Sequence, residues 1–201
     1  MTGAQKIEKI LKTNNGYVTR KDIDKENIHS IYLTRYVKKN NLRQIVRGFY
    51  ANDNWIVDPY LVLQYKYPRF IYSYNSAVFL LGLGDILPNY LEVTKPLNYH
   101  PFSKREEKIV VHSDTVDTSY YLGITEVTTN LGNKVKTYNK EKTICDLIRN
   151  KEKIEFEIYA KAINRYARSK DKNINKLMKY ARIMKIENKV RFQMEVMLND
   201  D

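Results

Sequence analysis

Length, composition and charge set the first limits. The chain has 201 residues, 43% hydrophobic and 29% charged, so it can bury a core and is not a disordered polymer. Its longest apolar stretch, residues 77–83, is far shorter than the roughly 20 residues that cross a bilayer. Because residues 1–11 lack an apolar leader and Cys145 is the one cysteine, we expect a cytosolic protein without disulfides.

The net charge of +12 favours a polyanionic partner. The excess lies at the two ends of the chain. Residues 1–50 hold 11 Lys or Arg against four Asp or Glu, residues 51–150 hold 11 of each, and residues 151–201 hold 13 against eight. A solvated surface is the simpler reading of scattered charge, but concentration at both ends favours a binding role.

The first fifty residues predict three short helices and a hairpin. Ile7, Ile10 and Leu11 recur at helical spacing, and residues 14–16 end that helix. Thr19 and Asp22 have the spacing of a capping box, which begins a second helix reaching about Glu26. A third helix is expected from residues 29–30 to 39, followed by a β-hairpin over residues 42–50.

This order predicts a winged helix-turn-helix, whose third helix enters the major groove of DNA while the wing touches the neighbouring backbone. Arg20 and Lys21 lie where the second helix begins, so its free N–H groups would also face phosphate, and Arg43 and Arg47 would flank the wing turn. The predicted DNA-binding residues are Arg20, Lys21, Ser30, Tyr32, Thr34, Arg35, Lys38, Lys39, Arg43 and Arg47.

The candidates for reading bases are the polar residues early in the third helix: Ser30, Tyr32, Thr34 and Arg35. Two alternatives stay open, since Ser30 can be the helix N-cap and Thr34 can lie on the flank. Tyr36 is expected in the core, and the lysines are expected to contact phosphate. The alternative to DNA binding is that this basic helix pair only packs on the chain's own second domain.

The remaining chain predicts an α+β domain. Helices are expected over residues 60–67, 76–83 and 140–149, and strands over 70–72, 91–94, 109–112, 124–129 and 134–138. A polar loop near residues 51–55 separates the two regions. The expected organisation is therefore a winged helix-turn-helix at 1–52 and an α+β domain at 53–201, strand-rich to residue 150 and helical and basic beyond it.

Residues 151–201 show three apolar stripes at helical spacing, which leave many basic residues for the surface. Such residues can be no more than the polar outer face of the helices. The alternative is a second basic surface that contacts DNA, the partner protein or an RNA. Its members would be Arg165, Arg168, Lys172, Lys176, Lys179 and Arg182.

An enzyme is the weaker hypothesis, and we expect no catalytic residues, cofactor or metal. Glu92 and Lys95, with Asp85, come nearest to a metal-dependent nuclease, but they are three residues apart where a shared strand face requires two. The three histidines have no metal-ligand spacing, and Cys145 suits a buried apolar position. No phosphate-binding glycine motif is present.

The chain also contains 17 tyrosines. Tyr65, Tyr67, Tyr72 and Tyr74 cluster in the sequence and could stack on the bases of a single strand. An AT-rich coding sequence also yields many Tyr, Asn, Lys and Ile residues, and this compositional account is the preferred one.

Three segments resemble the AbiEi antitoxins of bacterial abortive-infection (type IV toxin–antitoxin) systems. Residues 32–50 end in Arg47-Gly48-Phe49-Tyr50, like the closing strand of the family's winged helix. Residues 73–83 are similar to its S-x-x-S-A-x-x-L-x-G-L helix, and residues 141–148 are similar to its E-[KR]-T-[IL]-x-D-[LI] motif. The segments occur in the family's order, whereas residues 151–201 carry no matching motif.

The resemblance implies an antitoxin that binds inverted repeats in its promoter, represses its own operon and counteracts a nucleotidyltransferase-like toxin, AbiEii, directly or indirectly. We expect a monomer in solution, more than one copy on the operator, and no membrane partner. The alternative is a toxin-docking or RNA- or single-strand-binding module that reads no DNA sequence.

Overall fold

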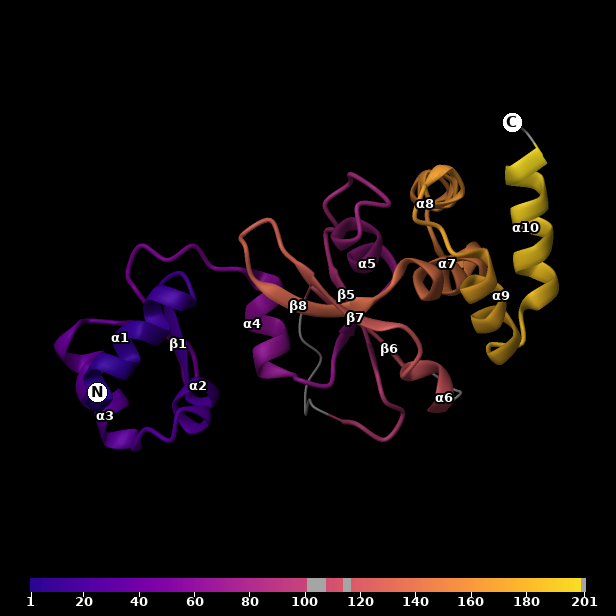
Figure 1. Cartoon of the computed structure of the whole chain (residues 1–201). Helices are drawn as coiled ribbons and strands as arrows, with labels where there is room; N and C mark the ends of the chain where they lie inside the picture. Colours follow the sequence, from indigo (N-terminus) through magenta and orange to yellow (C-terminus); the bar gives the residue numbers. More distant parts are fainter. Residues whose placement is uncertain (101–107, 114–116, 200–201) are drawn as a thin grey trace. The chain divides into compact units, whose positions relative to one another are not determined.

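The computed structural model describes residues 1–100, 108–113 and 117–199. The chain divides into two compact units, Met1–Lys66 and Tyr67–Asp201, each described by itself below. The fold is α+β, as predicted (Figure 1). In the part of the chain that the structure describes, no helix is long and apolar enough to span a bilayer.

The N-terminal unit runs in the order α1 (Gly3–Thr13), β1 (Tyr17–Thr19), α2 (Arg20–Lys25), α3 (Ser30–Lys39), β2 (Arg43–Val46), β3 (Phe49–Ala51) and α4 (Pro59–Lys66). The predicted helices and hairpin are confirmed, including the capping box of Thr19 and Asp22. The sequence did not predict β1. It pairs antiparallel with β3 and makes a three-stranded sheet of order β1-β3-β2.

The N-terminal unit extends past the predicted boundary at residue 52. Leu61, Val62 and Tyr65 of α4 pack on a small core formed by Phe49, Ala51 and Trp55. The Tyr65 hydroxyl also donates to the carbonyl of Gly48 at 2.8 Å. Helix α4 therefore belongs with the hairpin, because its side chains cover Phe49 together with Tyr17 and Trp55.

The C-terminal unit holds a five-stranded mixed sheet of order β6-β5-β4-β8-β7. The strands are β4 (Ile71–Tyr72), β5 (Leu91–Lys95), β6 (Ile109–Ser113), β7 (Ile124–Thr128) and β8 (Lys134–Tyr138). The β7–β8 hairpin is confirmed, with the turn residue Gly132 at φ +80°. The parallel pairings β5–β6 and β4–β8 join strands from distant parts of the chain.

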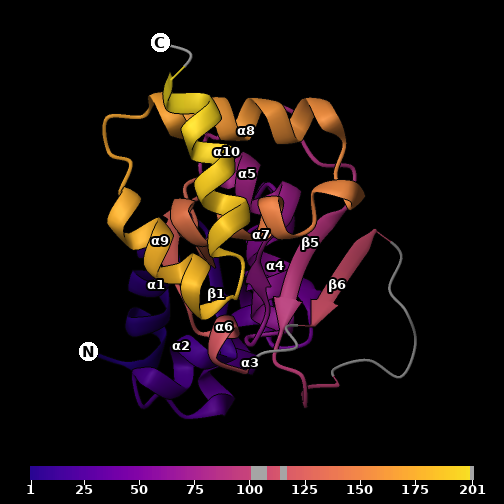
Figure 2. The same cartoon turned by 90° about the vertical axis from the view of Figure 1, so that its right-hand side faces the viewer.

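Helices α5 (Tyr74–Leu80) and α7 (Lys140–Arg149) connect this sheet to a helical core. Helix α5 begins two residues earlier than predicted, with Ser73 at its N-cap position, and ends at Leu80. The Ser76 hydroxyl accepts a hydrogen bond from the Glu92 N–H of β5 at 2.8 Å. Helix α7 is capped by Asn139, as predicted. The last three helices, α8 (Phe156–Arg168), α9 (Ile174–Ile183) and α10 (Glu187–Asn199), follow the predicted stripes and pack around α7 (Figure 2). Two short elements, α6 (Asp117–Tyr120) and η1 (Lys151–Lys153), complete the unit.

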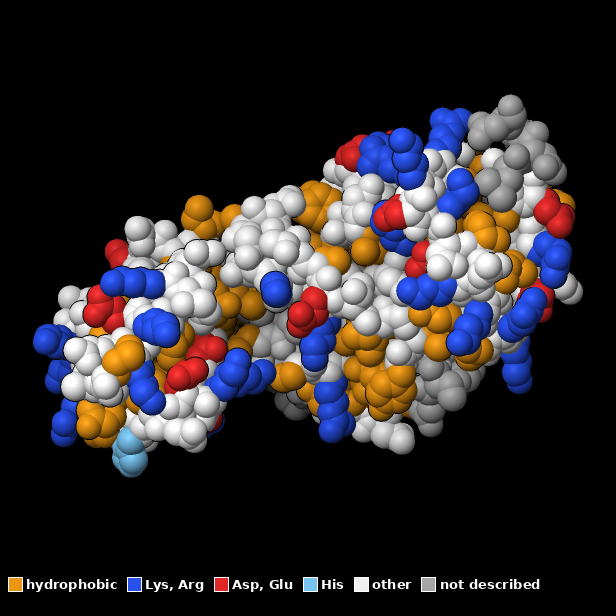
Figure 3. Space-filling view, viewed as in Figure 1, with side chains coloured by type: hydrophobic (Ala, Val, Ile, Leu, Met, Phe, Trp, Pro, Cys, Tyr) orange, Lys and Arg blue, Asp and Glu red, His pale blue; other side chains and the backbone are white. Residues whose placement is uncertain are grey.

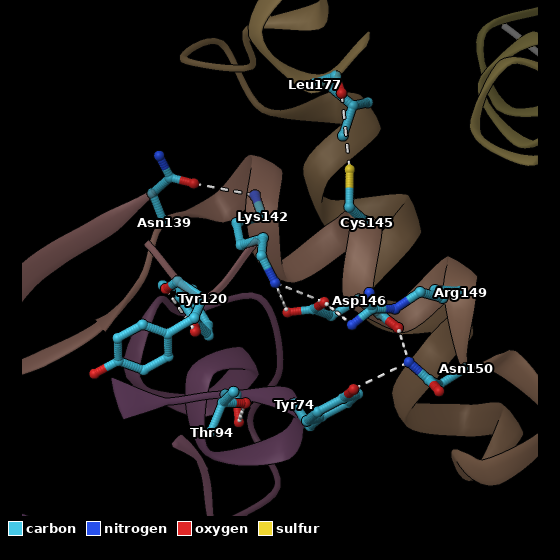
Figure 4. Close-up of polar contacts among 12 residues, drawn as sticks. Tyr74, Thr94, Tyr120, Asn139, Lys142, Cys145, Asp146, Arg149, Asn150 and Leu177 are labelled. Carbon is cyan, nitrogen blue, oxygen red and sulfur yellow. Dashed lines mark hydrogen bonds and ion pairs between the residues drawn. The ribbon is translucent and has the colours of Figure 1, made fainter. Parts of the chain in front are cut away.

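Helix α7 differs from the amphipathic helix that its sequence predicts. Every residue from 141 to 148 is buried, including Lys142 and Asp146, which are each 1% exposed. The Lys142 ammonium lies 2.8 Å from both Asp146 carboxylate oxygens (Figure 4). It also lies 4.4 Å from the centre of the Tyr138 ring. Arg149 adds a second cation at 3.2 Å. The buried charges are therefore paired, which is the condition under which a core tolerates them.

Candidate nucleic-acid interface

One face of α3 is anchored in the core of the N-terminal unit and the opposite face is exposed. Leu33 is 4% exposed and packs among Ile7, Val18 and Ile23, and the half-buried Tyr36 and Val37 pack against the same core. The prediction that Tyr36 belongs to the core is therefore confirmed. Because side chains three or four residues apart share a helix face, this anchoring leaves residues 31, 32, 34, 35, 38 and 39 exposed within the unit.

The N-cap of α3 is His29, so Ser30 is the first helical residue and not the cap. The His29 Nδ1 accepts from the Ile31 N–H at 3.3 Å. Ser30 is half-buried, and its carbonyl accepts a hydrogen bond from the Thr34 hydroxyl at 3.3 Å. Thr34 itself is exposed, which leaves its methyl group and hydroxyl accessible one turn into the helix.

Tyr32 is held in place by the start of α1. A Cβ atom added to Gly3 would lie 2.6 Å from the Tyr32 Cγ, which is closer than real Cβ contacts come. The ring therefore lies directly on the Gly3 backbone while 44% of Tyr32 stays exposed. Sequence reasoning missed this contact, because nothing in the spacing of residues 3 and 32 links them.

The cations of the α3 face are not neutralised by neighbouring acids. Arg35, Lys38 and Lys39 are exposed, and so is Arg47 in the β2–β3 turn. Within the described residues none of these four side chains forms an ion pair, unlike the exposed Lys12 of α1, which pairs with Glu8 at 3.0 Å. Figure 3 shows lysine and arginine side chains in blue over the helices of the N-terminal unit.

The start of α2 is less open than expected. Its first N–H groups are already bonded: Arg20 N–H donates to the Gly48 carbonyl at 2.7 Å and Asp22 N–H to the Thr19 hydroxyl at 3.2 Å. The Arg20 guanidinium pairs with Asp24 at 3.1 Å. The Lys21 ammonium lies 4.9 Å over the Tyr65 ring. The N–H groups of Arg20 and Asp22 are therefore not free, contrary to the expectation that the first N–H groups of this helix would face phosphate.

Arg43 does not flank the turn of the hairpin. It pairs with Ala51 at the far end of β2, and its guanidinium donates to the Trp55 carbonyl at 2.8 Å. Arg47 does lie in the turn, next to Gly48, which has a φ of +77°. Arg43 thus ties the hairpin to the loop that follows it, and Arg47 alone remains as the turn's arginine.

The tyrosine cluster is part of the core. Tyr67, Tyr72 and Tyr74 are buried, and Tyr65 is half-buried against Phe49. Stacking of nucleic-acid bases on these rings, which the sequence left open, would require the core to open. In the sequence, the apolar residues around these tyrosines are the signal for burial. That signal is stronger than the number of tyrosines as an indication of base stacking.

The basic residues of α8 and α9 are partly engaged with acids of their own unit. Arg165 pairs with Asp85, Lys176 lies 3.8 Å from Glu141, and Arg182 pairs with Glu187. Arg168 and Lys179 are exposed and Lys172 is half-buried. The six residues thus do not form one uniform set of unpaired cations.

Asp85 and Glu92, the acids that come nearest to a nuclease site, are engaged in separate ion pairs. Asp85 is held by Arg165 and Lys161, which lower the pKa of its carboxyl to about 2. Glu92 lies 3.0 Å from the His112 Nε2. Among the described residues, no group of three or more His, Cys, Asp or Glu side chains could hold a metal ion. His112, Ser113 and Asp114 are the residue types of a hydrolase triad, but adjacent strand residues alternate faces and cannot form such a relay. Asp114 itself lies outside the described residues.

This chain is similar to a solved structure and matches a family model. A crystal structure of the RV2827C protein from Mycobacterium tuberculosis matches with a TM-score of 0.50 and 14% identity, covering 98% of this chain and 80% of that one. At this identity the likeness concerns the fold. No curated protein matches by sequence. The model of the family described as "Transcriptional regulator, AbiEi antitoxin" matches residues 5–52, the segment that carries α1 to β3, and so confirms the family resemblance there.

Proposed function

We propose that this protein is an AbiEi-type antitoxin whose N-terminal unit is a winged helix-turn-helix that binds its own promoter. The family match over residues 5–52 and the order helix, strand, helix, helix, hairpin support the proposal. In such modules the last of the three helices lies in the major groove. Here that helix is α3.

The observation that carries the proposal is the exposed, unneutralised face of α3. In the proposed complex Tyr32, Thr34 and Arg35 face the base edges, where arginine can bond guanine with both of its terminal nitrogens. Lys38, Lys39 and the hairpin residue Arg47 contact phosphates, which fix orientation and carry no sequence information. Arg20, Lys21 and Arg43 already have contacts within the unit, so they are weaker candidates for DNA contact.

The experiment is a competition gel shift with the DNA upstream of this gene. A sequence-specific repressor keeps its promoter complex in excess random duplex, and Arg35→Ala weakens promoter binding more than random binding. Lys12→Ala is the matched control, because it removes the same charge from α1. If random duplex displaces the protein readily, or if both duplexes lose equally with Arg35→Ala, sequence reading by α3 is refuted.

The second part of the proposal is that the protein counteracts a nucleotidyltransferase-like toxin of the AbiEii type. The family whose model matches residues 5–52 is described as an antitoxin family, and the resemblance to that family implies a toxin partner. Co-expression with the neighbouring toxin gene tests it: growth arrest by the toxin alone should be relieved by this chain. Unrelieved arrest with both proteins present at normal levels refutes the antitoxin role.

We further propose that the protein acts by binding and without catalysis, as a monomer that places more than one copy on an inverted repeat. The ion pairs of Asp85 and Glu92 support the first part, since neither acid is poised as a free base. If promoter DNA gives only one shifted band at all protein concentrations, the binding of more than one copy is refuted. The alternative, a toxin-docking or RNA- or single-strand-binding module, predicts a promoter complex that random duplex strips away.

A further inference from the structure

A groove of about 480 Å³ lies in the C-terminal unit, and neither Asp85 nor Glu92 lines it. Its lining comes from the end of α7, from η1, from Tyr159 of α8 and from one face of α10. This volume falls in the range of small-ligand sites and suits one or two nucleotides. The groove is built from helices that share the buried core of the unit, so its walls are fixed by packing.

The walls are tied together by polar contacts of their own. The Tyr159 hydroxyl donates to the Gln193 side-chain oxygen at 2.7 Å, which joins α8 to α10. Burial raises the pKa of Tyr159 to about 12, so this donor keeps its proton at physiological pH. The Lys151 ammonium lies 5.1 Å over the same ring.

The lining is strongly basic. The residues that line the groove include four cations, Arg149, Lys151, Lys153 and Lys189, and one acid, Glu152. Arg149 is engaged by Asp146, but Lys153 and Lys189 are exposed and make no ion pair within the described segments. The groove therefore offers at least two cations to an incoming anion without breaking an existing pair.

An exposed aromatic ring stands beside these cations. Phe192 of α10 lines the groove and is 70% exposed, one turn after Lys189. Because the Phe192 ring stays in water next to Lys189, the groove offers an apolar surface and unpaired cations to the same partner. A flat ring next to unpaired lysines matches a base attached to its phosphate.

We propose that this groove binds a single-stranded nucleic-acid segment. Phosphates contact Lys153 and Lys189, and a base stacks on Phe192, the combination of cationic groove and aromatic platform found in single-strand binders. An acidic peptide would use the lysines but gains no stacking. The proposal is independent of duplex reading by α3, because it concerns another unit and other residues.

The test measures fluorescence anisotropy of labelled 12-nucleotide single strands, DNA and RNA, with the full chain at low salt. Because stacking on one ring is worth about 1–3 kcal/mol, Phe192→Ala should weaken binding by about 5- to 150-fold, while Phe192→Trp should preserve it. Lys189→Ala should reduce the slope of log affinity against log salt by about 0.7. Phe156→Ala is the control, since Phe156 is 78% exposed on α8 but does not line the groove.

Four outcomes overturn the proposal. The first is unchanged affinity of the Phe192→Ala variant, and the second is an equal loss with Phe156→Ala. The third is displacement of the single strand by polyglutamate as readily as by unlabelled oligonucleotide, which would reduce the site to charge alone. Arg35→Ala separates the two proposals: it should impair promoter binding and leave single-strand binding unchanged, and loss of both would place the single strand on α3 instead.

Discussion

The salt dependence of duplex binding is the sharpest quantitative consequence of the proposed interface. Arg35, Lys38, Lys39 and Arg47 are the cations of α3 and the hairpin turn that make no ion pair within the described residues. Each phosphate that a protein neutralises on B-DNA contributes about −0.9 to the slope of log affinity against log salt. Lys38, Lys39 and Arg47, which contact phosphates in the proposed complex, make three such contacts per copy and give a slope of about −2.7, so that raising salt from about 50 to about 200 mM lowers affinity about 40-fold.

Removing one of these cations changes that number by a known amount. Lys38→Ala should bring the slope to about −1.8, and the loss of affinity over the same salt range then falls to about 12-fold. A short random duplex that holds one copy is the proper substrate, because phosphate contacts do not depend on sequence. Fluorescence anisotropy across a salt series gives both slopes directly.

Lys12→Ala provides the matched comparison, since Lys12 is exposed on α1 and already paired with Glu8. It removes the same formal charge and should leave the slope unchanged. If Lys12→Ala and Lys38→Ala reduce the slope equally, net charge and not the α3 face drives binding. A slope near zero for the unaltered protein refutes the interface outright.

Three further predictions follow from single contacts. Gly3→Ala should weaken promoter binding in a gel shift, because its Cβ would lie 2.6 Å from the Tyr32 Cγ and must displace that ring; unchanged binding would show that Tyr32 contributes nothing. Lys142→Met should lower the free energy of unfolding by about 3–5 kcal/mol, because it leaves the Asp146 charge buried with Arg149 alone; a loss below about 1 kcal/mol would mean that Arg149 suffices. Burial raises the pKa of the Cys145 thiol to about 12, so the native protein should not react with a thiol reagent at pH 8 and should react once unfolded; rapid native reaction would contradict its burial.

Periodic patterns predicted most elements well because local physics decides them. The apolar spacing of residues 7, 10 and 11 and the cap at Thr19 and Asp22 act over one or two helical turns, and both occur as predicted. The stripes of the last fifty residues gave α8 to α10 for the same reason. The long-range pairings were out of reach: β1 has only three residues, too few for an alternating pattern, and the partner of β4 in β8 lies over 60 residues away.

The candidate site was predicted in part. Helical arithmetic placed Tyr32, Arg35, Lys38 and Lys39 on one exposed face, because the core contacts of Leu33 fix the rotation of the helix. It could not show which cations are engaged within the unit, since the bonds of Arg43 to Trp55 and of Arg20 to Asp24 depend on side-chain geometry. The groove at Phe192 was also missed, because its walls come from α7, η1, α8 and α10 together.

The most direct test of the central claim is DNA cleavage from a chelate attached to α3. The single native cysteine, Cys145, is buried, so Ile31→Cys offers one accessible thiol for an iron chelate on the exposed face of α3, at a residue with no assigned DNA contact. We predict cuts at a few defined nucleotides within the promoter repeat from position 31, and none from a chelate attached through Lys12→Cys on α1. Cleavage from position 12 but not from position 31, or cuts spread evenly along the DNA, would contradict the account.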